Sequence, residues 1–383
     1  MKQNWEIKKL GDICENLDSK RVPITKSSRV AGDIPYYGAS GIVDYVGDYI
    51  FNEDLLCVSE DGANLIARTY PIAFSISGKT WVNNHAHVLK FSNIITQKLV
   101  ELYLNSIKLD DYVSGMAQPK LNQTMLNRIP IPIPPLAEQE RIVSILDKAF
   151  SVIEEAKQNA EKNLKNAKEL FDSYLSNFFT NKGDDWEVKK LGEVLTIERG
   201  GSPRPIDKYI TTDLDGFNWI KISDATASNK YIYETKEKIS KEGLHKTRLV
   251  IEGDFILSNS MSFGRPYIMK TTGCIHDGWL VLRQDKNISF NTEFLYYLLS
   301  SPYVFQQFNN LAAGSTVRNL NIALVSSVLV PIPPIKEQEK IVQKLNVLSM
   351  ETKQLEKIYQ QKLIELEDLK KSILQKAFNG ELV

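Results

Sequence analysis

The chain repeats itself. The segment at residues 132–143 (PIPPLAEQERIV) returns 199 residues later at 331–342 (PIPPIKEQEKIV). A second pair of segments, WEIKKLG at 5–11 and WEVKKLG at 186–192, lies 181 residues apart. The two offsets differ by about 18 residues, so the second copy is longer between its two markers. The sequence therefore predicts two units, near 1–184 and 185–383, whose ends match and whose middles differ.

Length and composition narrow the class of protein. The chain has 383 residues, too many for one ordinary core, and 43% of them are hydrophobic. No apolar run reaches the roughly 18–20 residues that span a bilayer, and the first residues form no apolar signal region. We therefore expect a cytoplasmic protein with no membrane partner.

Charged residues and cysteines give weaker signals. The 47 basic and 47 acidic residues cancel, although nucleic-acid binding usually leaves a basic excess. An acidic helical face can offset a basic groove, so DNA binding remains open. Cys14, Cys57 and Cys274 show no metal-ligand spacing. His85 and His87 have no third ligand nearby in the sequence, so we interpret them as turn or core residues and expect no metal site.

Each unit has the same order of parts: a strand-rich region, a proline-rich joint and a long helix. Short segments rich in β-branched and aromatic residues alternate with turn signals, for example 73–76 and 86–91 in the first unit and 217–222, 255–257 and 280–282 in the second. Helical patterns appear near 99–103 and 294–299. The expected class is α+β.

Two long helices follow the joints, each with apolar or small residues at alternating steps of four and three. The positions are 142, 146, 149, 153, 156, 160, 164, 167, 171, 174 and 178, and then 341, 345, 348, 352, 355, 359, 363, 366, 369, 373 and 377. This is the seam of a coiled coil, and roughly 40 residues give a helix of about 60 Å. Each helix is the natural partner of the other. We expect antiparallel packing related by a pseudo-two-fold axis; a parallel pairing is the alternative.

The proline joints have a structural interpretation. Proline fixes φ and lacks an N–H, so residues 130–135 are expected to leave the sheet as an extended segment. Glu138 and Glu337 then fall in the first helical turn, where the helix dipole favours negative charge. A polyproline ligand for an SH3-like domain is the alternative. Residues 73–80 mimic a phosphate-binding loop, but strand and turn residues follow where that loop needs a helix.

The repeated joint, the repeated WxxKKLG opening and the ending AFNGEL at 377–382 together resemble the specificity subunit of type I restriction–modification systems. The resemblance covers the whole chain. It implies two target-recognition domains, each reading one half of a split, asymmetric DNA site, and two helical regions that dock two methyltransferase subunits. Restriction subunits join the complex. The specificity subunit does no chemistry, so S-adenosylmethionine, ATP and magnesium belong to the partners and this chain carries no cofactor.

The DNA-reading residues are sought on loops. Arg and Lys recognise guanine, Asn and Gln recognise adenine, and Lys, Ser and Thr bind phosphate. The loops are 37–41, 60–68, 77–87 and 115–122, and 199–204, 258–265 and 314–321. The candidate contacts are Ser40, Asn64, Arg68, Lys79, Thr80, Asn83, Gln118, Lys120, Arg199, Ser202, Arg204, Asn259, Ser262, Arg265, Thr316, Arg318 and Asn319.

The last loop of each unit is the most informative. At the 199-residue offset Asn122 aligns with Asn321, whereas Gln118 and Lys120 align with the different residues Val317 and Asn319. A shared frame with changed side chains fits altered readout, so Gln118 and Arg318 are the first candidates. The matching asparagines are expected to be structural.

The prediction is a non-catalytic DNA-recognition subunit. Its domains would be 1–136 for the first recognition domain, 137–180 for the central helix, 181–335 for the second recognition domain and 336–383 for the C-terminal helix. A protein-binding coiled-coil scaffold is one alternative, but it does not explain two unlike regions with polar, glycine-rich loops. The recognition part of a fused methyltransferase is another, but the sequence has no Asn-Pro-Pro-aromatic run for amino-methyl transfer.

Overall fold

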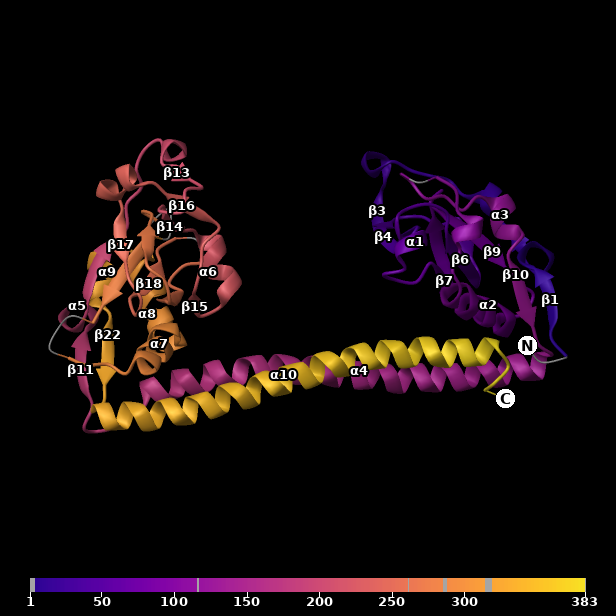
Figure 1. Ribbon diagram of the computed structural model, residues 1–383. Coiled ribbons are helices and arrows are strands. Elements are labelled where there is room, and N and C mark those ends of the chain that lie inside the picture. The colour runs from indigo at the N-terminus through magenta and orange to yellow at the C-terminus, as the bar shows by residue number, and fades with distance from the viewer. Residues whose placement is uncertain (1–3, 116, 261, 285–287, 314–318, 383) are drawn as a thin grey trace. The chain divides into compact units, whose positions relative to one another are not determined.

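The computed structural model describes residues 4–115, 117–260, 262–284, 288–313 and 319–382 (Figure 1). The chain divides into two compact units. Unit 1 comprises Met1–Glu161 and Gln360–Val383, and unit 2 comprises Lys162–Tyr359. Each unit thus holds one strand-rich region and about half of each long helix. None of the helices in the described ranges combines the length and apolar character of a membrane span.

Unit 1 opens and closes its strand-rich region with paired strands. The strands are β1 (Glu6–Lys9), β2 (Glu15–Asn16), β3 (Ala31–Gly38), β4 (Gly41–Val46), β5 (Phe51–Asn52), β6 (Leu55–Ser59), β7 (Ala73–Ile76), β8 (Lys79–Val82), β9 (Ala86–Lys90) and β10 (Pro130–Ile133). The helices are α1 (Asn64–Ala67), α2 (Ile94–Ser106), α3 (Gln123–Asn127) and the first part of the long α4 (Leu136–Thr180). The sheets have the orders β2-β9-β6-β7, β4-β3-β8-β5 and β1-β10. Strand β8 begins at Lys79, as the sequence predicts for the phosphate-loop mimic.

Unit 2 repeats this plan with longer sheets. The strands are β11 (Glu187–Lys190), β12 (Thr196–Arg199), β13 (Ile210–Thr211), β14 (Phe217–Ile220), β15 (Tyr231–Ile232), β16 (Glu237–Ile239), β17 (Arg248–Val250), β18 (Phe255–Ser258), β19 (Pro266–Met269), β20 (Gly273–Ile275), β21 (Trp279–Arg283) and β22 (Leu329–Ile332). The helices are α5 (Leu191–Val194), α6 (Ile222–Ser228), α7 (Thr292–Ser300), α8 (Pro302–Leu311), α9 (Ile322–Ser327) and the first part of the long α10 (Ile335–Phe378). The sheets have the orders β12-β21-β18-β19-β15, β13-β16-β14-β20-β17 and β11-β22.

Strand β6 explains the layers of unit 1. All five of its residues are buried. Leu56 and Val58 lie in the core with residues of α2, whereas Leu55 and Cys57 lie in the core with residues of the second sheet. Because successive side chains point to opposite faces, this strand is covered by a helix on one face and by a sheet on the other. Strand β18 divides its residues between two cores in the same way.

The two long helices run antiparallel within each unit. In unit 1, Leu146 of α4 shares a core with Leu374 and Ala377 near the end of α10. In unit 2, Leu175 near the end of α4 shares a core with Ile341 near the start of α10. The predicted α+β class, with its internal repeat and antiparallel helix pair, is confirmed.

The heptad seam is correct along most of its length and wrong at three places. In α4 the buried side chains shift from the predicted 174 and 178 to Leu175 and Phe179, because this end of the helix packs into the core of unit 2. In α10, Leu355 and Leu369 are exposed although they fall on the predicted seam. A sequence period alone does not distinguish packing on a helix from packing on a sheet domain.

The proline joint also differs from the prediction, because it stays in a sheet. Strand β10 pairs antiparallel with β1, so that Ile7 faces Pro132, and β22 pairs with β11 in the same register, with Val188 facing Pro331. Prolines at alternate positions leave every second N–H available, which suffices for a two-stranded edge. The two repeated sequence motifs of each unit are therefore hydrogen-bonded neighbours. Glu138 and Glu337 lie in the first helical turns, as predicted.

Candidate nucleic-acid interface

The last loop of each unit is anchored by the same backbone contacts. The N–H of Leu121 donates to the carbonyl of Glu60 at 2.8 Å, and the N–H of Leu320 donates to the carbonyl of Asn259 at 2.8 Å. Glu60 and Asn259 follow directly after β6 and β18. The next residues in each loop, the matching asparagines 122 and 321, cap α3 and α9 with their side chains. The prediction that these asparagines are structural is confirmed.

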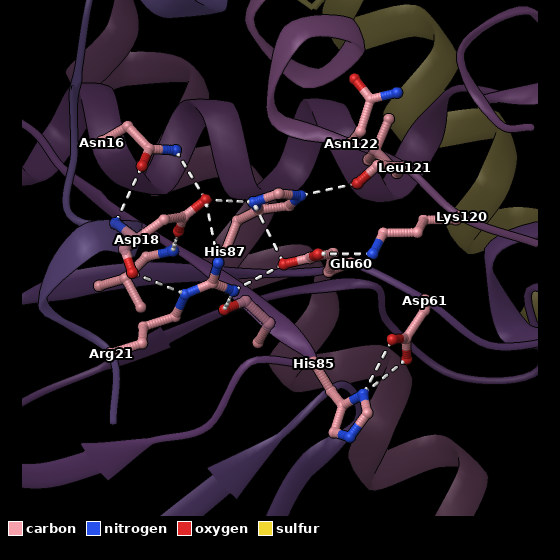
Figure 2. A network of polar contacts seen from close by, with 12 residues as sticks. Asn16, Asp18, Arg21, Glu60, Asp61, His85, His87, Lys120, Leu121 and Asn122 are labelled. Carbon is pink, nitrogen blue, oxygen red and sulfur yellow. Dashed lines mark hydrogen bonds and ion pairs between the residues drawn. The ribbon is translucent and has the colours of Figure 1, made fainter. Parts of the chain in front are cut away.

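A buried polar network lies beneath this loop in unit 1 (Figure 2). His87 of β9 is 1% exposed. Its Nδ1 lies 2.5 Å from Oδ2 of Asp18, and its Nε2 lies 2.7 Å from the carbonyl oxygen of Leu121. The other carboxylate oxygen of Asp18 accepts from the N–H of Val88 at 2.9 Å. The sheet, the turn at residue 18 and the loop are thus joined through one imidazole.

Glu60 links the same network to Lys120. Its Oε2 accepts from Arg21 at 2.7 Å, and its Oε1 lies 3.2 Å from the ammonium of Lys120. Burial alone would raise the pKa of Glu60, but the hydrogen bond from Arg21, the charge of His87 and the hydrogen bond from Lys120 outweigh it and hold the pKa below its usual value. Glu60 therefore stays ionised and keeps Lys120 near the base of the loop.

Among the residues that the structure describes, Asp18, Glu60 and His87 have metal-ligand spacing, with ligand atoms within 4.8 Å of one another. The charges of both carboxylates are already balanced by Arg21 and Lys120, and both nitrogens of His87 are hydrogen-bonded. A metal would have to displace these partners. We therefore treat the group as a hydrogen-bonded network.

The 114–122 loop presents polar side chains above this network. Its base is closed by the backbone pair between Ser114 and Lys120, with N–H to carbonyl distances of 2.9 and 2.8 Å. Gly115 has a φ of +86°, which favours glycine, and a Cβ there would lie 2.6 Å from the carbonyl oxygen of Gln118. Gln118 and Lys120 are both exposed. The loop is therefore closed tightly enough to present these two side chains in a defined place.

In unit 2, Asp277 accepts hydrogen bonds from several of the predicted contact residues, and we call such acidic residues organisers. Its carboxylate accepts from Ser202 at 2.7 Å and from Arg204 at 3.4 Å. Its carbonyl accepts from Arg199 at 3.1 Å and from Asn259 at 2.8 Å. The hydrogen bond from Ser202 lowers the pKa of Asp277, and the charge of Arg204 lowers it further. One acidic residue thus gathers four of the predicted candidates.

The chain matches the family model described as the type I restriction modification DNA specificity domain, over residues 2–164 and 183–367. It belongs to this specificity family. A putative type I restriction enzyme specificity subunit of Haemophilus influenzae is 30% identical over 88% of this chain and 86% of its own length. A type I specificity subunit of Methanocaldococcus jannaschii is 24% identical over 99% of this chain and 93% of its own length.

Solved structures share the fold of this specificity subunit. A chain from a type I restriction–modification system, described for its complex assembly and conformational transition, superposes with a TM-score of 0.77 at 19% identity, covering 100% of this chain and 99% of that one. The HsdS subunit of Thermoanaerobacter tengcongensis gives a TM-score of 0.61 at 18% identity, covering 100% and 98%. The predicted role as a non-catalytic DNA-recognition subunit is confirmed by this membership.

Several predicted contacts of this specificity subunit are exposed, on loops, on turns or at the first or last residue of a strand. These are Ser40, Lys79, Gln118, Lys120, Arg199, Arg204, Ser262, Arg265 and Asn319, while Ser202 is half-buried. Lys79 lies over the ring of Tyr49, 4.9 Å from its centroid. Arg265 lies 5.4 Å from the centroid of Tyr267. Thr316 and Arg318 lie outside the described residues.

Other candidates point inward and support the loops. Thr80, Asn83, Asn64 and Asn259 are buried. The side chain of Asn64 bonds to the backbone of Thr69 and Tyr70, and Arg68 donates to the carbonyl of Ile107 at 2.5 Å. The side chains of Asn64 and Arg68 are therefore occupied within the fold. The sequence does not reveal this, because a polar residue in a turn gives the same composition signal whether it faces in or out.

The sequence reasoning missed the organisers. Asp18, Glu60 and Asp277 are acidic, and a search for DNA contacts selects basic and amide side chains. His87 is a core residue, as predicted, but its contact with Leu121 joins residues 34 positions apart. These half-buried carboxylates lie beside basic side chains. In the sequence their only signal is an acidic residue near a loop that is predicted to contact DNA.

Proposed function

We propose that each strand-rich region reads one half of a split DNA site through the loops that Glu60 and Asn259 anchor. Gln118 and Lys120 would contact DNA from unit 1, and Arg199, Arg204, Arg265 and Asn319 from unit 2. The recognition domains would be residues 1–136 and 181–335, joined by helical regions 137–180 and 336–383. The buried candidates Asn64, Thr80, Asn83 and Asn259 would support these loops.

The single observation that carries the proposal is the common loop frame with unlike side chains. Leu121 and Leu320 are held by the same backbone bond, but the acid Glu60 in one unit is replaced by Asn259 in the other. Lys120 in the loop of unit 1 likewise aligns with Asn319 in the loop of unit 2. A shared backbone anchor with different donors and acceptors beside it suits two different base sequences.

The long helices would dock two methyltransferase subunits that modify adenine N6, and restriction subunits would join that complex. In unit 2, α10 exposes Val347, Met350 and Ile358, and in unit 1 it exposes Ile364 and Leu369. Exposed apolar side chains of this kind fit protein contacts. S-adenosylmethionine, ATP and magnesium would be bound by the partner subunits.

The test is to map methylated adenines in DNA treated with the assembled complex. Exchange of residues 1–136 for those of a relative should change one half of the methylated site and leave the other half and the spacer unchanged. A site that does not change would favour the scaffold alternative. Methylation by the isolated chain would favour the fused-methyltransferase alternative.

A further inference from the structure

In the network of Figure 2, the side chain of His87 connects strand β9 to the carbonyl of Leu121 in the 114–122 loop. Both of its ring nitrogens face acceptors, a carboxylate oxygen of Asp18 and the carbonyl oxygen of Leu121. Carbonyl and carboxylate oxygens only accept, so both bonds form together when both ring nitrogens carry protons. The ring is 1% exposed, so water cannot easily replace either partner.

The ring is fixed before it reaches the loop. Asp18 is held on its other side by the N–H of Val88 and by Asn16, whose amide lies 3.2 Å from Oδ2. Arg21 donates to Glu60 and, at 2.7 Å, to the carbonyl of Ala86. The network therefore ties β9 to the turn at residue 18 and to the end of β6, and it leaves His87 little freedom to follow a moving loop.

Unit 2 has no such side chain at the same place. In unit 1 His87 pairs with Val58, one residue before the end of β6, and in unit 2 Leu280 pairs with Leu257, one residue before the end of β18. Leu280 is fully buried in the core. A leucine side chain cannot hydrogen-bond, so the histidine contact is a feature of one recognition domain, and the fold accommodates leucine at this position.

We propose that His87 is a positioning residue for DNA reading by unit 1, holding the carbonyl of Leu121 so that Gln118 and Lys120 stand at a fixed place against the bases and phosphates. The inference rests on the proposed function. Without His87 the loop keeps the Leu121–Glu60 bond, the bond from the N–H of Gly62 to the carbonyl of Pro119 and the Ser114–Lys120 pair, but the carbonyl of Leu121 loses its bond to the imidazole. Discrimination should then fall at every base read by this loop, roughly ten-fold, as expected for one hydrogen bond.

The test uses the full chain assembled with its methyltransferase subunits. The rate of methylation is measured on the cognate site and on sites with single changes in either half, for the wild type and for His87→Leu, His87→Gln and His245→Leu. Glutamine can still donate to Leu121, so His87→Gln should recover part of the discrimination that His87→Leu loses. His245 is exposed in unit 2, so its variant should discriminate in the first half-site as the wild type does.

The expected result is a loss confined to the half-site assigned to unit 1 by the domain exchange. Unchanged discrimination in a folded His87→Leu, or an equal loss in both halves, would overturn the inference. If His87→Leu does not fold, His87→Gln decides alone: a smaller loss confined to the first half-site supports the inference, whereas unchanged discrimination, an equal loss in both halves or failure to fold overturns it. A wild-type complex that methylates no split site would instead contradict the proposed function itself.

Discussion

The indole Nε1 of Trp186 donates to Oε1 of Glu337 at 3.0 Å, although 151 residues separate them in the chain. The first residue belongs to the repeated opening motif and the second to the repeated joint. Strands β11 and β22 bring the two motifs together. In unit 2 the two ends of the repeat therefore meet at the start of a long helix.

Replacing Glu337 by Ala should destabilise unit 2 by about 1–2 kcal/mol, because it removes the acceptor of Trp186 and a negative charge at the start of α10. Chemical unfolding of the chain would measure this. Glu339, two residues further along the same helix, is exposed and provides the matched control. An equal loss in Glu339→Ala would mean that the indole contact contributes nothing.

Lys120 and Gln118 lie in one loop and should affect DNA binding in different ways. Lys120→Ala should reduce the slope of log affinity against log salt by about 1, because one phosphate contact is lost. Gln118→Ala should leave the slope unchanged and relax the choice of base at one position. Binding measured over a salt series, on cognate and altered sites, separates the two effects. A reduced slope in both variants would assign Gln118 to the backbone as well.

The buried network of unit 1 should make stability depend on acid pH. Burial alone would raise the pKa of Asp18, but the hydrogen bond from His87 and the charge of Arg21 hold it below the usual value. A carboxyl with a lowered pKa stabilises the folded state fully above its unfolded pKa, near pH 4, and loses this contribution as the pH falls through the folded value.

The stability difference between the wild type and Asp18→Asn should therefore be largest above about pH 5 and should narrow toward about pH 3. Thermal unfolding at a series of pH values measures it. Asp48→Asn, at an exposed turn, is the control for removal of a carboxylate. A difference that widens on acidification would show that the contacts of Asp18 do not favour its ionised form.

The sequence predicts local and periodic features well, because they depend on neighbouring residues. The long helices, the strands at 73–76 and 255–257 and the asparagine caps follow from spacing and turn chemistry. Contacts that join distant segments could not be predicted, for example the bond of His87 with Asp18 across 69 residues. The prolines misled the interpretation of the joint because their lack of an N–H excludes a central strand but permits an edge pair.

Two leucines of α10 test whether a residue on the predicted heptad seam is buried, which the heptad pattern alone does not show. Leu366 and Leu369 both fall on the predicted seam, but Leu366 is 7% exposed and Leu369 is 47% exposed. Leu366→Ala should cost about 2–4 kcal/mol in the unfolding free energy of unit 1, because it leaves a cavity, whereas Leu369→Ala should cost less than about 1 kcal/mol. Denaturant unfolding of both variants measures the difference. Equal losses of unfolding free energy in the two variants would mean that Leu369 is buried in solution. Its side chain would then not be available to a docking subunit.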